Sequence, residues 1–258
     1  MSIRNARFTA AVIGPDAVVA KSLTPALQTA MNASVYTFTD LADAWAVLDQ
    51  LRPDLIYAAQ APPAVDAPAF TRELRRSELA VRKAPVVMLA HDPTEALTRA
   101  ARDAGVHEVL RDPFSLEELV RRTAAVLSHK RDWIEAISYV GPDRRHFNSG
   151  VYPGQRRRRA DLESPEDARV GQALKIMKSA IEAIDSDPRQ ALRAMRAQID
   201  ALQDVALSKG DFVLVQTAKV LRGQLELSVH AGRFNGEGFA GDAQEVLGAD
   251  APVRRLAT

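Results

Sequence analysis

The chain has 258 residues, of which 47% are hydrophobic and 26% are charged. This composition is typical of a globular protein, and the length allows two modest domains. There is no cysteine, so disulfides, thiolate metal sites and cysteine nucleophiles are excluded. No apolar run reaches the ~20 residues of a membrane-spanning helix, so we expect no membrane insertion and a cytoplasmic location. The formal net charge of +1 gives no reason to expect a nucleic-acid partner.

Residues 7–128 alternate between short apolar runs and segments with helical periodicity. Leu41, Trp45, Leu48 and Leu51, for example, form a helical stripe. The predicted strands are Phe8–Ile13, Ser34–Phe38, Leu55–Ala58, Val86–Ala90 and His107–Leu110. Strands that alternate with helices indicate crossover connections and a parallel sheet with helices on both faces. We therefore predict an α/β domain with a five-stranded, parallel, doubly wound sheet.

Residues 129–163 differ from the first domain in their amino-acid composition. Arg131–Ile137 is predicted to form a short helix that packs back on the first domain. The following stretch, "YVGPDRRHFNSGVYPGQRRRRAD", holds three glycines, two prolines and six arginines. Glycine and proline interrupt helices and strands alike. We interpret 129–163 as an Arg/Gly/Pro-rich linker.

Residues 164–232 carry the signals of three amphipathic helices. Ser164 and Asp187 each precede a proline and are predicted N-caps, while Gly210 ends a helix and Asp211 caps the next. The apolar stripes allow two arrangements, a closed three-helix bundle or a helical module whose remaining apolar width packs on a second copy. Residues 233–258 are rich in Gly, Asp and Ala and are predicted to form a loose tail.

The motifs of residues 7–128 resemble a known family. "PDLIYAA" is followed by prolines in the next turn, "ARDAGVHEVL" contains Ala-Gly before the fifth strand, and "DPFSLEELV" follows that strand. This order is similar to the receiver domain of bacterial response regulators, which has a flavodoxin-like fold. The resemblance implies a role in two-component, or phosphorelay, signal transduction.

Phosphorylation in that family requires a fixed set of side chains. The resemblance implies an acidic pair that binds Mg²⁺ after the first strand, a nucleophilic aspartate that ends the third, a Thr or Ser on the fourth and a Lys after the fifth. The matching positions here are Gly14, Pro15, Ala59, Ala90 and Asp112. We therefore predict a degenerate receiver, or pseudo-receiver, without catalytic residues, bound metal or Mg²⁺.

A shifted register does not restore the nucleophile. Residues 57–61 read Tyr-Ala-Ala-Gln-Ala, and Asp16 is the only acidic residue near the position of the acidic pair. Asp54 lies five residues before Ala59, ~16 Å along a strand at ~3.3 Å per residue. Asp66 lies beyond two prolines, past the turn. None of the five histidines has the helical spacing of a metal site.

The arginine-rich stretch 141–161 of this linker, here called the arginine segment, is compatible with several hypotheses. Guanidinium groups bind phosphate bidentately, pair with the guanine edge and stack on flat rings. The segment is therefore compatible with a cyclic dinucleotide such as cyclic di-GMP, with an acidic protein surface, with non-specific nucleic acid, or with a solvated basic linker. The candidate binding residues are Arg144, Arg145, Arg156, Arg157, Arg158 and Arg159.

Together these features predict a non-enzymatic signalling protein that acts by protein–protein interaction without phosphorylation. The expected partners are signalling proteins, bound through the receiver-like face and the C-terminal helices, with a homodimer as a further possibility. One alternative is an effector that binds cyclic di-GMP. A second alternative is a phosphorylatable response regulator that uses a non-standard site.

Overall fold

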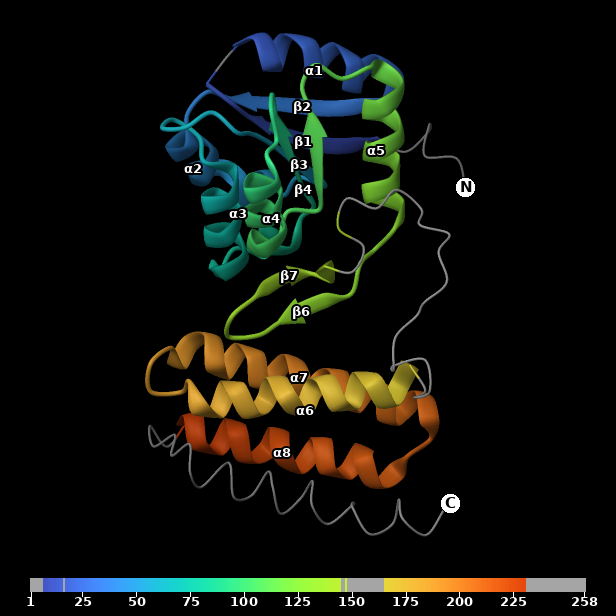
Figure 1. Cartoon of the computed structure of the whole chain (residues 1–258). Helices are drawn as coiled ribbons and strands as arrows, with labels where there is room; N and C mark the ends of the chain where they lie inside the picture. Colours follow the sequence, from blue (N-terminus) through green and yellow to red (C-terminus); the bar gives the residue numbers. More distant parts are fainter. Residues whose placement is uncertain (1–6, 16, 145–146, 148–164, 231–258) are drawn as a thin grey trace. The chain divides into compact units, whose positions relative to one another are not determined.

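The computed structural model describes residues 7–15, 17–144, 147 and 165–230 (Figure 1). The chain divides into two compact units. The first comprises the residues up to Ile134 together with Tyr139–Pro153, and the second comprises Glu135–Ser138 and the residues from Gly154 onward. In the described part of the chain, no helix is long and apolar enough to cross a membrane.

The first unit is built on a five-stranded parallel sheet. Its strands are β1 (Phe8–Ile13), β2 (Ala33–Phe38), β3 (Leu55–Ala59), β4 (Val86–Ala90) and β5 (Glu108–Arg111). They are arranged in the order β2-β1-β3-β4-β5, with every pair parallel. This is the flavodoxin-like order of a doubly wound sheet. The predicted fold class is confirmed, because continuous apolar runs such as β3 and β4 are buried on both faces.

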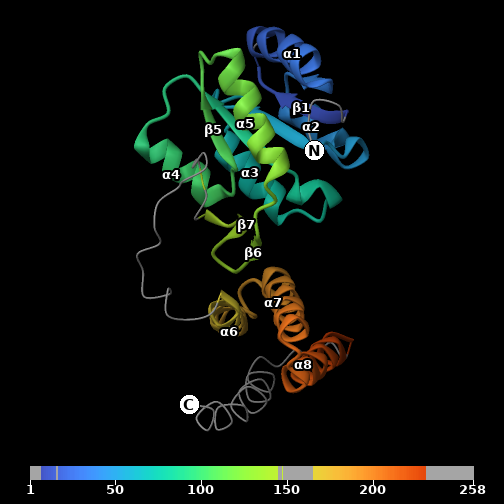
Figure 2. The same cartoon turned by 90° about the vertical axis from the view of Figure 1, so that its right-hand side faces the viewer.

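Helices cover both faces of this sheet (Figures 1 and 2). One face packs against α1 (Ala17–Met31) and α5 (Leu116–Ser128). The other face packs against α2 (Leu41–Leu51), α3 (Ala67–Arg76) and α4 (Glu95–Ala104). A short 3-10 helix, η2 (Ala80–Lys83), lies between α3 and β4. The core therefore has two apolar layers, one on each side of the sheet.

A two-stranded hairpin follows α5, where a helix was predicted. Its strands are β6 (Trp133–Glu135) and β7 (Val140–Pro142). The prediction of a helix over Arg131–Ile137 is therefore wrong, and part of the predicted linker has regular structure. Short apolar runs fit a strand as well as a helix, so periodicity alone does not separate the two.

The hairpin's second strand is closely packed within the first unit. A Cβ atom built on Gly141 would lie 2.9 Å from the Cα atom of Gly105, so the two glycines allow a close approach of main chains. The Tyr139 hydroxyl is buried and donates to the carbonyl oxygen of Pro142 at 2.5 Å. Burial raises the pKa of Tyr139 to about 12. The "YVGP" motif thus forms an ordered part of the first unit.

The second unit contains α6 (Pro165–Glu182), α7 (Pro188–Lys209) and α8 (Phe212–His230). Asp187 and Asp211 cap α7 and α8 as predicted, and α7 ends at Gly210 in the left-handed conformation. Ser164 lies outside the described residues. Helix α7 packs against both α6 and α8, which are not neighbours of each other (Figure 2). The three helices thus form an open layer centred on α7.

The segment Glu135–Ser138 belongs to this second unit. The side-chain amide of Gln190 donates to the Glu135 carboxylate at 3.0 Å, and that of Gln198 donates to the Glu135 carbonyl oxygen at 3.1 Å. Both glutamines are buried, and Ile137 packs against the helical core. Buried amides need such partners, because an unsatisfied donor costs about 1–3 kcal/mol.

Candidate functional site

The carboxyl edge of the sheet brings the predicted site positions together. Gly14 follows β1, Ala59 ends β3, Ala90 ends β4 and Asp112 follows β5. Parallel strands end at the same edge, which is where ligands bind in doubly wound sheets. These four residues therefore lie at the same edge of the sheet.

The side chains at this edge are small and closely packed. Ala59 and Ala90 are 5% and 3% exposed. A Cβ atom built on Gly14 would lie 3.1 Å from the Cβ atom of Ala59, so any side chain at Gly14 requires its neighbour to move. The side-chain oxygen of Gln60, the residue after Ala59, accepts from the main-chain N–H of Ala67 at 2.9 Å. Gly14, Ala59 and Ala90 therefore provide no acidic ligand at this edge.

The two nearest aspartates on either side of Ala59 have other roles. Asp54 lies before β3, and its carboxylate accepts from the main-chain N–H of Thr9 at 2.8 Å. Asp66 is the N-cap of α3 and accepts from the main-chain N–H of Ala69 at 3.0 Å. Both carboxylates are therefore engaged with main-chain donors. Asp16 and the side chain of any residue up to Lys21 lie outside the described part of the chain.

Two contacts between exposed side chains lie at this edge. Asp112 lies 3.8 Å from His91, and Arg111 lies 3.8 Å from Asp92. Exposed pairs of this kind contribute little to stability. Among the described residues, no group of three or more His, Asp or Glu side chains could hold a metal ion. Pro15, the remaining predicted position, follows Gly14 and is partly buried.

Of the candidate arginines, the structure describes Arg144. Its guanidinium donates to the Asp103 carboxylate at 2.9 Å and lies 4.3 Å from the ring centre of Tyr139. Although partial burial opposes it, hydrogen bonds from Arg102 and Arg144 lower the pKa of Asp103. Arg144 thus has contacts within the protein. The other predicted candidates, Arg145, Arg156, Arg157, Arg158 and Arg159, lie outside the described residues.

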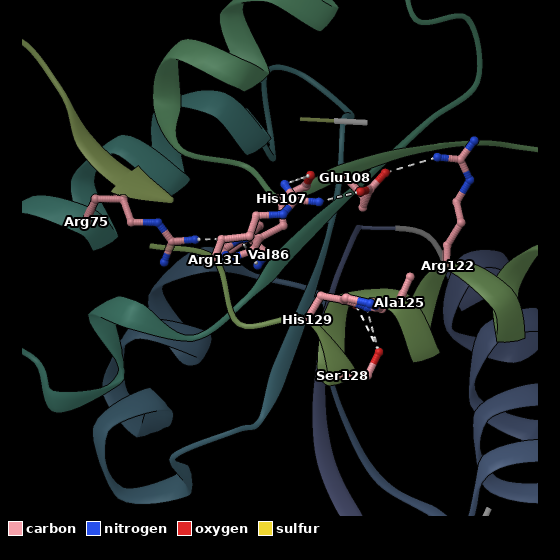
Figure 3. A network of polar contacts seen from close by, with 9 residues as sticks. All are labelled: Arg75, Val86, His107, Glu108, Arg122, Ala125, Ser128, His129 and Arg131. Atoms are coloured by element: carbon pink, nitrogen blue, oxygen red, sulfur yellow. Dashed lines mark hydrogen bonds and ion pairs between the residues drawn. The ribbon is translucent and has the colours of Figure 1, made fainter. Parts of the chain in front are cut away.

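The opposite, amino edge of the sheet holds a buried arginine that the sequence did not indicate (Figure 3). Arg75, at the end of α3, is completely buried. Its guanidinium donates to the carbonyl oxygens of Gly105 at 3.0 Å, Arg82 at 2.6 Å and Ala84 at 2.9 Å. It also lies 5.4 Å from the ring centre of Trp133. Burial is the main cause that lowers its pKa to about 9, so Arg75 remains charged at neutral pH.

Three more charged residues join this edge to α5 and to the chain that follows it (Figure 3). The buried carboxylate of Glu108 contacts Arg131 at 2.6 Å and Arg122 at 3.1 Å. Arg131 also donates to the carbonyl oxygen of His107 at 2.8 Å. These contacts fix the segment after α5 beside β5. Their partners are main-chain and side-chain groups of the same unit, which indicates a structural role.

His107 is the titratable group at the centre of this network. It is buried, its Nδ1 atom accepts from the main-chain N–H of Val86 at 3.3 Å, and a guanidinium nitrogen of Arg75 lies 3.5 Å away. Burial, together with the charges of Arg75 and Arg131, lowers the pKa of His107 well below 6.5. The imidazole is therefore neutral in the folded protein at physiological pH.

Comparison with known proteins shows which family the first unit is similar to. Residues 11–124 match the family model described as the response regulator receiver domain. Among solved structures, the receiver domain of the sensor histidine kinase PA1611 from Pseudomonas aeruginosa, determined with magnesium in its active-site cleft, is 22% identical, with a TM-score of 0.43. It covers 48% of this chain and is itself covered completely.

Two further solved structures are similar. The Vibrio cholerae chemotaxis protein CheY4 is 22% identical, with a TM-score of 0.44, covering 47% of this chain and 100% of its own. The receiver domain of a DNA-binding response regulator from Colwellia psychrerythraea is 16% identical, also with a TM-score of 0.44, covering 47% of this chain and 99% of its own. The search of curated proteins gave no match.

Proposed function

Because residues 11–124 form a receiver domain of the response regulator family, we propose that this chain is a two-component signalling protein that acts without accepting a phosphoryl group. The single observation that supports this most is the packing of Gly14 against Ala59 at the carboxyl edge of the sheet. Where the resemblance calls for a nucleophile and metal ligands, this edge presents buried small side chains.

The chemistry of phosphoryl transfer explains why this matters. An aspartyl phosphate forms when a carboxylate oxygen attacks phosphorus, and Mg²⁺ neutralises the phosphoryl oxygens. The methyl group of Ala59 has no lone pair to attack with, and Ala90 has no hydroxyl to bind a phosphoryl oxygen. Asp112, in place of a lysine, adds a negative charge where the phosphoryl group would need a positive one.

A receiver without a phosphoryl switch is proposed to act by binding. Any change of conformation must then come from a partner or ligand that prefers one state over another. The surface formed by α4, β5 and α5 is available for such partners, and the C-terminal helices offer a second surface. In this proposal the protein is a non-enzymatic adaptor, located in the cytoplasm with other two-component proteins.

The binding of a cyclic dinucleotide remains a prediction from the arginine segment. Arg144 is engaged with Asp103 and Tyr139, so it would have to exchange these contacts for a phosphate or a guanine. Nothing in the described part of the chain favours this function over protein binding. The same holds for nucleic acid and for phosphorylation at a non-standard site.

The proposal is tested with Mg²⁺ and beryllofluoride, which together imitate a phosphorylated aspartate. We expect no change in the unfolding midpoint of the full chain at millimolar concentrations of both. A receiver domain with an intact acidic pocket is the control, and ligand at 100 times its dissociation constant should stabilise it by about 2.7 kcal/mol. A comparable stabilisation of this chain would refute the proposal.

A further inference from the structure

His107 is held at the amino edge of the sheet as a hydrogen-bond acceptor (Figure 3). The main-chain N–H of Val86 lies 3.3 Å from its Nδ1 atom, and a guanidinium nitrogen of Arg75 lies 3.5 Å from the same atom. A peptide N–H and a guanidinium can only donate, so Nδ1 carries a lone pair and no proton while both contacts are kept. These contacts therefore fit a neutral imidazole and exclude the imidazolium ion.

The charged side chains of the amino edge are mostly positive. They come from α3, η2, β5, α5 and the chain after α5, and they are Arg75, Arg82, Glu108, Arg122 and Arg131. The Glu108 carboxylate already binds Arg122 and Arg131. Burial, and after it the charges of Arg75 and Arg131, lower the pKa of His107. A proton on His107 would thus add a positive charge beside two guanidinium groups.

The same two arginines hold the segment that follows α5. Arg131 belongs to this segment and donates to the carbonyl oxygen of His107 at 2.8 Å. The guanidinium of Arg75 lies 5.4 Å from the ring centre of Trp133, within the range of a cation–π contact. His107 therefore contacts both of the arginines that fix the segment Arg131–Ile134 on the first unit.

This segment is held less firmly than the other elements that meet at His107. The main-chain N–H of His107 donates to the carbonyl oxygen of Val86 in β4 at 2.8 Å, and Arg75 belongs to a helix of ten residues. The strands β6 and β7 have three residues each, and a two-stranded hairpin is at best marginally stable by itself. Local opening is drawn from the least stable elements, so we expect it to begin in this segment.

We propose that protonation of His107 releases the segment Arg131–Ile134 from the amino edge while the five-stranded sheet stays folded. The imidazolium ion repels Arg75 and Arg131, and its Nδ1–H points at the N–H of Val86. When the segment detaches, Arg131 and Trp133 reach water, and the imidazole has room to turn away from Val86. The attachment of the hairpin is therefore sensitive to acid. This goes beyond the proposed function, because the carboxyl edge takes no part in it.

The direction of the pH dependence follows from the protons that each state binds. The pKa of an exposed imidazole is ~6.5, and that of His107 in the closed state is lower. The opened state therefore binds more protons, and the ratio of opened to closed protein increases by up to ~10-fold for each pH unit below ~6.5. Between pH ~6.5 and ~4.5 the ratio should increase by up to ~100-fold.

The test follows the fluorescence of Trp133 in the full chain with Trp45→Phe, which leaves one tryptophan. As the pH falls from ~7.5 to ~3.5, the emission should move to longer wavelength at least ~0.5 pH unit before the far-ultraviolet circular dichroism is lost. His107→Gln should lower the midpoint of the emission change by at least ~0.5 pH unit, because glutamine accepts from Val86 but does not titrate. His91→Gln is the matched control, because the His91 side chain is 83% exposed, and should leave the midpoint unchanged.

Three results would overturn the proposal. The first is an emission change that coincides with the loss of circular dichroism, since the segment would then be released only by unfolding of the whole unit. The second is an equal midpoint in the wild type and His107→Gln, which would assign the acid sensitivity to Glu108 or another carboxylate. The third is an equal shift in His91→Gln.

Arg131→Gln tests the proposal independently if His107→Gln does not fold. This change removes a contact with Glu108 and one of the charges that oppose protonation of His107. Both effects should raise the midpoint of the Trp133 emission change, by at least ~0.5 pH unit. Arg121→Gln, at an exposed position on α5, is the control and should leave the midpoint unchanged. A midpoint in Arg131→Gln that stays the same or falls would contradict the proposal.

Discussion

Replacing Arg75 with methionine is expected to lower the free energy of unfolding of the first unit by about 3–5 kcal/mol. Methionine fills much of the volume but donates no hydrogen bond. The carbonyl oxygen of Gly105, which is buried, and those of Arg82 and Ala84, which are partly buried, would then lack the donors that Arg75 supplies. Each unsatisfied group costs about 1–3 kcal/mol, which accounts for the size of the effect.

The measurement is urea denaturation of the full chain, followed by the fluorescence of Trp133 and Trp45, which both lie in the first unit. Arg72→Met is the matched control, because Arg72 lies on the same helix and is exposed. It should change the stability by less than about 0.5 kcal/mol. A similarly small change for Arg75→Met would mean that the buried network does not hold this edge together.

Lowering the pH from 7.5 to 5.5 is expected to cost about 1.4 kcal/mol of stability through His107 alone. The pKa of His107 is lowered in the folded state, so the unfolded state binds more protons below pH ~6.5. The contribution of His107 to the free energy of unfolding is therefore fully present above pH ~6.5. It falls as the pH decreases below that value, by up to ~1.4 kcal/mol per pH unit. The loss continues until the folded-state pKa is reached.

The variant His107→Gln isolates this contribution. Its side-chain oxygen can still accept from the main-chain N–H of Val86, but it does not titrate. Chemical denaturation at several pH values should show a difference between wild type and variant that changes by about 1.4 kcal/mol between pH 7.5 and 5.5. Parallel curves for the two proteins would show that His107 is protonated equally well in the folded state.

The sheet and the position of its carboxyl edge were predictable from the sequence. Strands such as Val86–Ala90 are uninterrupted apolar runs, and the residues after them, such as Gly14 and Asp112, fall at one edge in any parallel sheet. The order of the strands was not predictable from periodicity, which carries no information on which strands pair, and it followed only from the resemblance to the receiver fold. The close contact between Gly14 and Ala59 also required coordinates, because residue types do not give packing distances.

The sequence did not predict the buried network at the amino edge or the β6–β7 hairpin, and the reason is a different one. Arg75 stands in the basic pair Arg75-Arg76 at the end of a helix, where arginine is ordinarily exposed and interacts with the helix dipole. Its burial depends on carbonyl groups that come from distant parts of the chain. The hairpin likewise depends on Gly105, more than 30 residues before Gly141, and local sequence patterns do not report such contacts.

The two edges of the sheet thus differ in whether the side chains that they bury are charged. The amino edge buries charged residues, among them Arg75 and Glu108, each with polar partners. The carboxyl edge, which carries the chemistry in the receiver family, buries small uncharged residues such as Ala59 and Ala90. This distribution is consistent with a receiver fold kept for its surfaces rather than for phosphoryl transfer.

The most direct test of that view is the intact mass of the full chain after incubation with acetyl phosphate and Mg²⁺. We predict that the mass remains that of the unmodified chain, under conditions in which a receiver with an intact aspartate gains one phosphoryl group of about 80 Da. A stable gain of that mass, lost after treatment with hydroxylamine as an acyl phosphate would be, would contradict the account.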